Sequence, residues 1–378
     1  MKKKIYFVTD YIFDNRDYER FQIYKLKKKF KVNIISISKI VYPNNKININ
    51  DYHKDVKFVN DFSFMNDIKN DLFHTIVIDL MILNFKTQYL KFLLKYNNIK
   101  FVRILLGQHP SVKSQNTNFL YKIFFNLFLY KGKESRYLLF KNKILSLFNN
   151  FIKPSIVISG GDYLKNYFKK KKINNINFVS YDYHLAHLKK KRIIKNRYAV
   201  FIDNGLLGNR DYSLFGVNNF KNLNFYHNKL NLFFKKIEKI YKLRIIIAAH
   251  PKSNTKILGK NFKSFKLISN KTTELIKYCD FVMMHKSTAI SSAIIYSKPV
   301  LLLSMKEFAS TWLLKEIEYL SQILNLKIVN IDDNSDFTKI KISYSRKDYL
   351  KYKNNFLKSS NVRYSNYTNK IIKTLCEL

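Results

Sequence analysis

Short apolar runs recur along the first half of the chain, separated by segments long enough to hold a helix. The runs are β-branched or aliphatic almost throughout, which is typical of parallel strands covered on both faces. This alternation of strands and helices predicts an α/β domain built on a mostly parallel sheet. The predicted strands are KKIYFVTD (3–10), KVNIISIS (31–38), TIVIDLM (75–81), IKFVRILLG (99–107), SIVISGG (155–161) and NINFVSYDYH (175–184).

The same alternation restarts after a basic segment, LAHLKKKRIIKNR (185–197), which is the expected linker. YAVFIDNG (198–205) is the next predicted strand, and apolar residues at helical spacing predict a helix within residues 222–242. The remaining predicted elements are the strands RIIIAAHP (244–251), DFVMMH (280–285) and KPVLLLS (298–304), and the helices TTELIKYC (272–279) and STAISSAIIYS (287–297).

The two halves predict two Rossmann-like α/β domains that face each other across a cleft, since 378 residues are too many for one ordinary core. We expect the first domain over residues 1–190 and the second over 191–378. A segment rich in Phe, Leu and Lys, about 112–153, is the expected helical insertion in the first domain. Its helices either pack on that domain or form a face that meets a membrane surface.

Charge is the unusual feature of the composition: 69 Lys and Arg against 26 Asp and Glu give a net charge of +43. One interpretation is a compositional bias toward Lys, Asn, Ile, Tyr and Phe of the kind that AT-rich genomes produce. A second is an anionic membrane surface or an anionic lipid-linked substrate. Nucleic acid is the least favoured partner, because the basic residues are spread along the chain and no zinc-finger, RRM-like or helix-turn-helix pattern is present.

No run of about 18 uncharged apolar residues is present, and the basic start continues as a strand-like alternation instead of a signal peptide. The two cysteines, Cys279 and Cys376, lie far apart in the sequence, which makes a disulfide framework implausible. We therefore expect a cytoplasmic protein, with peripheral contact to the inner face of the membrane as an option.

Polar residues end three of the strands predicted for the second half. In parallel α/β sheets, ligands bind at the carboxyl ends of the strands. If the three strands are neighbours, their terminal groups converge on one site. The groups are Asp203, Asn204 and Gly205; His250, Pro251, Lys252 and Ser253; and His285, Lys286, Ser287 and Thr288.

These residue types suit chemistry at a phosphate. Pro251 holds the exit from its strand extended, and His250 can then donate a proton to a departing phosphate near neutral pH. Ser287 and Thr288 at a helix start offer hydroxyl and N–H groups to an anion. Asp203 can act as a general base. Each also has an ordinary alternative: a histidine that caps backbone groups, a plain helix N-cap, or a turn-forming aspartate.

Other polar residues have weaker claims on the site. Lys252 and Lys286 can offset the charge of a phosphate, or they are simply solvated. Asp182 and His184 end the last predicted strand of the first domain, where they either contact an acceptor or have a structural role. We interpret a second His-Pro pair, in GQHPS (107–111), as a loop of the acceptor-side domain.

The order acid-x-Gly, His-Pro, Ser-Thr resembles the three motifs of bacterial sialyltransferases and related CMP-sugar transferases with the glycosyltransferase B (GT-B) fold. TTELIKYCDFVMMHKSTAISSAIIYSKPVLLL also looks like the nucleotide-binding half of transferases that build surface polysaccharides. The similarity covers mainly residues 198–305. It implies a direct, inverting transfer of an acidic sugar from a CMP-activated donor to the hydroxyl of a glycan or lipid-linked glycan. Neither a metal nor a further cofactor is implied.

Carried over motif by motif, the resemblance implies Asp203 and His250 as catalytic residues. Asn204 departs from the acidic motif, whose middle residue is Asp or Glu, and an amide does not titrate. The base is therefore expected to be Asp203 or Asp211. The implied nucleotide- and phosphate-binding residues are Pro251, Lys252, Ser253, His285, Ser287, Thr288 and Gly205.

Two other functions stay open on the sequence. A nucleotide-sugar epimerase has the same two-domain layout and also uses acids and a histidine near a diphosphate. A polycation that binds RNA or lipid through charge alone would need none of the motif residues.

Overall fold

The computed structural model describes residues 2–45, 47–82, 84–105, 107, 109–110, 152–188, 190–205, 223–251, 253–308, 312–333, 340, 342–363 and 367–378. The expected insertion at 112–153 lies outside the described residues except for its last two. Lys252 and Asp211 also lie outside them.

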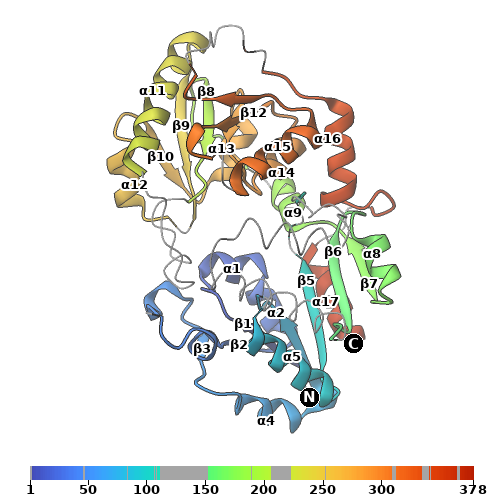
Figure 1. Ribbon diagram of the computed structural model, residues 1–378. Helices are drawn as coiled ribbons and strands as arrows, with labels where there is room; N and C mark the ends of the chain where they lie inside the picture. Colours follow the sequence, from blue (N-terminus) through green and yellow to red (C-terminus); the bar gives the residue numbers. More distant parts are fainter. Residues whose placement is uncertain are drawn as a thin grey trace, which may run out of the picture.

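The described strands form two parallel sheets, one in each half of the chain (Figure 1). The first has the strand order β3-β2-β1-β4-β5-β6-β7, and the second has the order β10-β9-β8-β11-β12-β13. Both are Rossmann orders. Successive strands are added on one side of the first strand, and the later strands are then added on its other side. The expected pair of Rossmann-like α/β domains is confirmed.

The first sheet consists of β1 (Lys4–Thr9), β2 (Lys31–Ser36), β3 (Val56–Phe58), β4 (Thr75–Asp79), β5 (Lys100–Leu105), β6 (Ile156–Gly160) and β7 (Asn175–Phe178). The helices described with it are α1 (Asn15–Arg20), α2 (Ile23–Lys29), α3 (Ser38–Val41), α4 (Phe64–Lys69), α5 (Phe85–Tyr96), α8 (Lys165–Lys170) and α9 (Tyr181–His187).

The second sheet consists of β8 (Tyr198–Ile202), β9 (Arg244–Ala249), β10 (Lys266–Ser269), β11 (Val282–Met284), β12 (Val300–Ser304) and β13 (Ile328–Asn330). The helices after β8 are α11 (Leu223–Tyr241), α12 (Thr255–Asn261), α13 (Thr272–Tyr278), α14 (Ile290–Ile295), α15 (Trp312–Leu324), α16 (Arg346–Tyr352) and α17 (Tyr367–Glu377).

The apolar runs produce strands covered on both faces, as their composition predicts. Every residue of β4, β6, β8 and β12 is buried. The helical stripe predicted within 222–242 forms α11, and its apolar side chains pack into the core against the second sheet. The buried members of the stripe are Tyr226, Leu230, Phe233, Phe234 and Ile237.

The predicted strand 175–184 is wrong in its second half. β7 ends at Phe178, and residues 181–184 begin α9. The Oγ of Ser180 accepts a hydrogen bond from the Tyr183 N–H at 3.1 Å, and Asp182 lies in the first turn. This N-cap and the favourable acidic residue outweigh the strand preference of the two tyrosines.

The end of the chain returns to the first domain, although we expected residues 191–378 to form the second domain alone. α17 packs against α2, and Phe178 stacks on Tyr367 with ring centroids 6.1 Å apart. The chain crosses between the domains beside Gly161, whose φ is +67°. A Cβ there would lie 2.2 Å from the Asn355 carbonyl oxygen, so the glycine makes room for this crossing.

Candidate functional site

A cavity of about 640 Å³ lies between the carboxyl edge of the second sheet and the first domain. Asp203, His250 and Ser287, which follow β8, β9 and β11, all line it. β8 pairs with both β9 and β11, and the strand order reverses at this point. The predicted convergence of three strand ends is therefore confirmed, and it occurs where open α/β sheets bind ligands.

Asp203 is 5% exposed and ties the ends of two strands together. Its Oδ2 accepts hydrogen bonds from the His250 N–H and from the Ser253 hydroxyl, each at 3.1 Å. Burial raises the pKa of this carboxyl, while these bonds and one from the Gly205 backbone oppose the rise. The Asp203 carboxylate therefore holds the turn that contains His250 and Pro251 against the end of β8.

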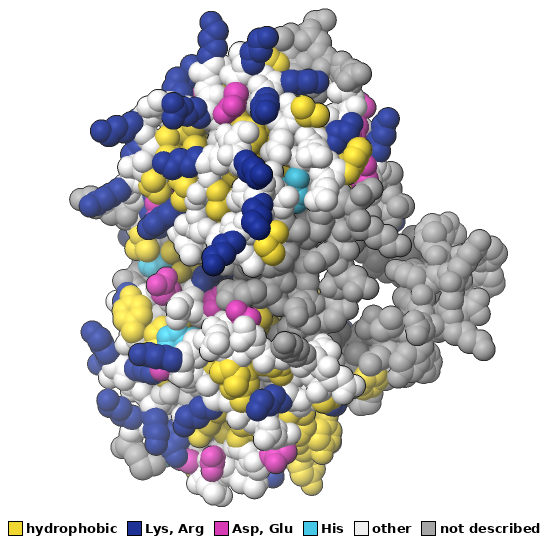
Figure 2. Space-filling model, turned by 90° about the vertical axis from the view of Figure 1, so that its left-hand side faces the viewer, with side chains coloured by type: hydrophobic (Ala, Val, Ile, Leu, Met, Phe, Trp, Pro, Cys, Tyr) yellow, Lys and Arg dark blue, Asp and Glu magenta, His cyan; other side chains and the backbone are white. Residues whose placement is uncertain are grey.

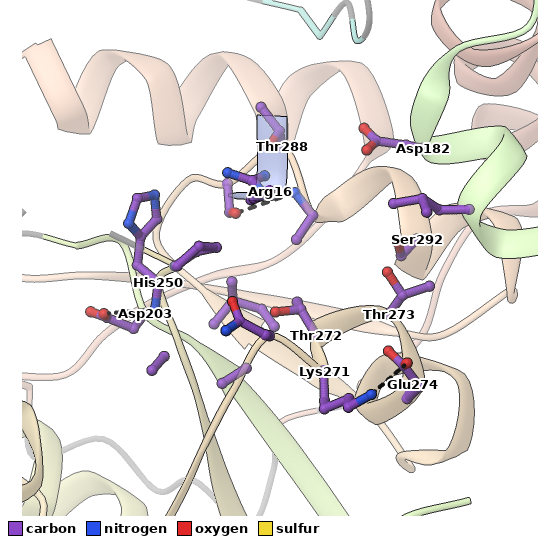
Figure 3. A pocket seen from close by; sticks show the side chains of 18 of the residues that line it. Arg16, Asp182, Asp203, His250, Lys271, Thr272, Thr273, Glu274, Thr288 and Ser292 are labelled. Atoms are coloured by element: carbon purple, nitrogen blue, oxygen red, sulfur yellow. Dashed lines mark hydrogen bonds and ion pairs between the residues drawn. The ribbon is translucent and has the colours of Figure 1, made fainter. Parts of the chain in front are cut away.

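His250 lies against Gly205, and the glycine is what allows this contact. Gly205 has a φ of +67°, and a Cβ there would be 2.8 Å from both Cγ and Nδ1 of the imidazole. Figure 3 shows Asp203 and His250 together at one end of the cavity. The acid, the glycine and the histidine therefore form one packed unit, in which the first two fix the place of the third.

The Ser-Thr pair lies in the turn before α14 instead of in the helix. α14 begins at Ile290, three residues after the predicted start, and the Ser287 Oγ accepts a hydrogen bond from the Ala289 N–H at 3.2 Å. Thr288 is exposed in the cavity. The neighbouring Lys286 forms an ion pair of 2.9 Å with Glu316.

His285 does not line the cavity, although the sequence placed it among the phosphate-binding residues. It is fully buried, with Nδ1 2.7 Å from the Leu303 carbonyl oxygen and Nε2 3.0 Å from the Tyr226 hydroxyl. Burial lowers its pKa to about 4, so the ring is neutral at physiological pH. The structure therefore gives His285 a role in the core beneath the site.

The first domain supplies the opposite wall of the cavity. Asp182 lines it, and burial raises the pKa of this carboxyl. His184, its expected companion, is buried elsewhere and stacks on Tyr367 with centroids 5.4 Å apart. Because Asp182 and His184 lie on a helix and not on a strand, they point in different directions.

Among the residues of this wall that sequence reasoning missed are His109 and Arg16. His109 belongs to the second His-Pro pair, which we had assigned to a loop of the acceptor-side domain. Burial and the nearby Lys286 lower the pKa of His109, so its neutral form predominates at neutral pH. His109 follows β5 of the first sheet, and this position at a strand end could have marked it as a residue of the cavity. Arg16 carries no motif, and only the fold brings it to the cavity.

The two residues after β10 and the first turn of α13 form the far end of the cavity. Thr272, Thr273 and Glu274 line it, and Glu274 lies 3.7 Å from Lys271 and 3.8 Å from Lys190 (Figure 3). The sequence predicted α13 here but not the four-residue strand β10 before it. Without that strand, nothing marked this segment as part of the carboxyl edge.

Comparisons with known proteins give likenesses of overall structure. No model of a protein family matches the sequence, and no curated protein matches it. Among solved structures, UDP-GlcNAc 2-epimerase from Methanocaldococcus jannaschii is 11% identical, with 99% of this chain and 100% of that chain covered and a TM-score of 0.47. MurG from Acinetobacter baumannii is 9% identical, with complete coverage of both chains and a TM-score of 0.47.

MnaA from S. aureus, in a co-structure with UDP, is 10% identical over 100% of this chain and 96% of that chain, with a TM-score of 0.48. The fold class of the present chain rests on its own two sheets: two Rossmann-like domains across a cavity form the GT-B arrangement.

No three His, Cys, Asp or Glu side chains in the described ranges are grouped as a metal ion would need. In the same part of the chain, no helix has both the length and the apolar character needed to cross a bilayer.

Gly205 should not tolerate a side chain. In Gly205→Ala, the positive φ and the overlap with the imidazole should lower the free energy of unfolding by about 1–3 kcal/mol, measured by urea titration. Gly259→Ala is the matched control, because a Cβ there meets nothing within 4 Å. That substitution lies in α12 and should raise stability by about 0.5–1 kcal/mol. Equal effects of the two substitutions would contradict the packed unit at Gly205.

Proposed function

We propose that the protein is a glycosyltransferase that uses a nucleotide-activated sugar, with the nucleotide bound to the second domain and the acceptor to the first. One observation carries this proposal. A single cavity between two Rossmann-like domains is lined by Asp203, His250 and Thr288. Such a cavity can hold a donor against one wall and an acceptor against the other. This arrangement suits a transfer reaction, in which both substrates must be bound at the same time.

In the proposed reaction, His250 assists the departure of the nucleotide phosphate. Its ring is fixed by Gly205, and its backbone N–H is held by Asp203. A histidine in such a place can donate a hydrogen bond or a proton to the leaving phosphate as negative charge develops there. Thr288 offers a hydroxyl to the same phosphate, and Arg16 approaches from the first domain with a positive charge.

Asp203 has a different proposed role from the one its motif implies. Its Oδ2 already accepts two hydrogen bonds, from His250 and Ser253 in the loop after β9. We therefore assign it as a positioning residue for His250. The opposite wall carries two groups able to accept the proton of an acceptor hydroxyl, the neutral imidazole of His109 and the carboxylate of Asp182.

The finer identity of the donor is also part of the proposal: a CMP-activated acidic sugar, transferred to a glycan or lipid-linked glycan. Its support is the order of the acidic, His-Pro and Ser-Thr motifs. The far end of the cavity is compatible with a nucleoside, since Glu274 and the hydroxyls of Thr272 and Thr273 can hydrogen-bond ribose hydroxyls.

Nucleotide preference and His250 give the first test. In thermal-shift measurements CMP or CDP should raise the melting temperature more than UDP or GDP does. His250→Ala should lower turnover of CMP-sialic acid by about 10²–10⁴-fold while CMP still binds. His74→Ala, at an exposed histidine outside the cavity lining, should keep full turnover.

A preference for UDP, together with epimerisation of a UDP-sugar, would favour the epimerase alternative over a cytidine donor. Full turnover in His250→Ala would contradict the proposed role of the histidine.

Two substitutions at Asp203 separate positioning from proton transfer. Asp203→Asn keeps an oxygen for the His250 N–H and the Ser253 hydroxyl, so kcat/KM should stay within about 10-fold of wild type. Asp203→Ala leaves both donors without a partner, which costs about 1–3 kcal/mol, and should weaken CMP binding as well as turnover. If the Asn variant binds CMP normally but is as inactive as the Ala variant, Asp203 takes the proton and the positioning role is wrong.

A further inference from the structure

An exposed aromatic stripe runs along α5 in the first domain. Phe85, Tyr89, Phe92 and Tyr96 follow one another at intervals of four, three and four residues, which places them on one face of the helix. Their exposed fractions are 39%, 54%, 49% and 75%. Large aromatic side chains gathered on one surface in this way usually mark an interaction site.

Packing of α5 on the domain does not require this stripe. The other face of the helix carries Leu90 and Leu94, which are 0% and 1% exposed and belong to the core beside the first sheet. Within the stripe, Phe92 stacks on Tyr96 with ring centroids 6.0 Å apart. Tyr89 contacts Phe62, which packs against that core, but each of the four aromatic side chains remains at least 39% exposed.

The charges on α5 are all positive. Its sequence, FKTQYLKFLLKY, contains three lysines and no acidic residue. Lys86 and Lys95 are exposed beside the stripe, and the Lys86 Nζ donates a hydrogen bond to the Ile40 carbonyl oxygen. Lys91 is buried against Asp79 at 3.2 Å. Asp61, next to the Phe62 ring that contacts Tyr89, supplies a negative charge at the margin. In Figure 2 hydrophobic side chains are exposed on the lower domain, among Lys and Arg side chains.

We propose that the α5 stripe docks the protein on the surface of an anionic lipid bilayer. Phe and Tyr rings are favoured at the boundary between headgroups and acyl chains, and lysine stems can lie along that boundary with their ammonium groups at the phosphates. The net charge of +43 attracts the whole chain to an anionic surface. The same charge disfavours a second copy of the chain as the occupant, because two such copies repel each other.

The stripe begins at the edge of the first sheet that faces the cavity and runs from there toward the start of β5 at Lys100. The helix begins six residues after β4 ends at Asp79, at the carboxyl edge of the first sheet. The α9 and His109 portions of the cavity wall follow other strands of that sheet, at the same edge. A bilayer on the stripe therefore lies beside the domain that carries this wall. Docking does not depend on the transfer reaction, so the two proposals can fail separately.

Vesicle binding by the full chain tests the proposal. Wild type should co-sediment with vesicles of 70% phosphatidylcholine and 30% phosphatidylglycerol, and its partition coefficient should fall at least 10-fold on pure phosphatidylcholine. The double variant Tyr89→Ser, Phe92→Ser should also lose about 10-fold or more on the anionic vesicles. Both side chains are about half exposed, so folding should persist, and circular dichroism melting checks this.

Tyr167→Ser is the matched control, since Tyr167 is 51% exposed on α8 among Lys165, Lys169 and Lys170. Its partition coefficient should stay within twofold of wild type. Equal partition of the double variant and wild type on anionic vesicles would overturn the proposal. If the double variant loses binding to a single-stranded RNA homopolymer but keeps vesicle binding, the stripe serves nucleic acid and the proposal is likewise overturned.

Discussion

The carboxylate of Asp203 ties together the ends of two neighbouring strands, and the geometry of the cavity depends on this contact. A buried carboxylate is unfavourable unless donors surround it. Here the donors are the His250 N–H and the Ser253 hydroxyl, at 3.1 Å each, and the Gly205 backbone. The need to satisfy one buried charge therefore fixes the turn that carries the imidazole.

The rest of the site follows from two sheets of the same topology. In each sheet the strand order reverses beside the first strand. Loops from distant parts of the sequence therefore meet at its carboxyl edge. The second sheet presents the acid, the histidine and the hydroxyl groups, while the first presents Arg16, His109 and Asp182. The chain crosses back to the first domain before α17, which packs on α2. Together with the linker before β8, this return gives the two domains a second connection.

How far the sequence predicts this arrangement depends on whether the cause is local. Apolar runs and strand-end motifs are local, so the strands that end at Asp203 and His250 were predicted together with their convergence. The burial of His285 depends on Tyr226, which is 59 positions earlier in the chain, and no motif carries that information. The return of α17 and the approach of Arg16 are equally non-local. Asp182 was predicted to face the cavity, but on a strand instead of a helix.

The proposed function requires that the carboxyl edge of the second sheet binds the phosphate of a nucleotide. Hydrogen–deuterium exchange of the full chain, measured by mass spectrometry with and without CMP, tests this most directly. Exchange is expected to be slower in peptides that contain Gly205, His250 and Thr288, since bound nucleotide closes these strand ends to water. Unchanged exchange in all three peptides at saturating CMP, or protection confined to the first domain, would contradict it.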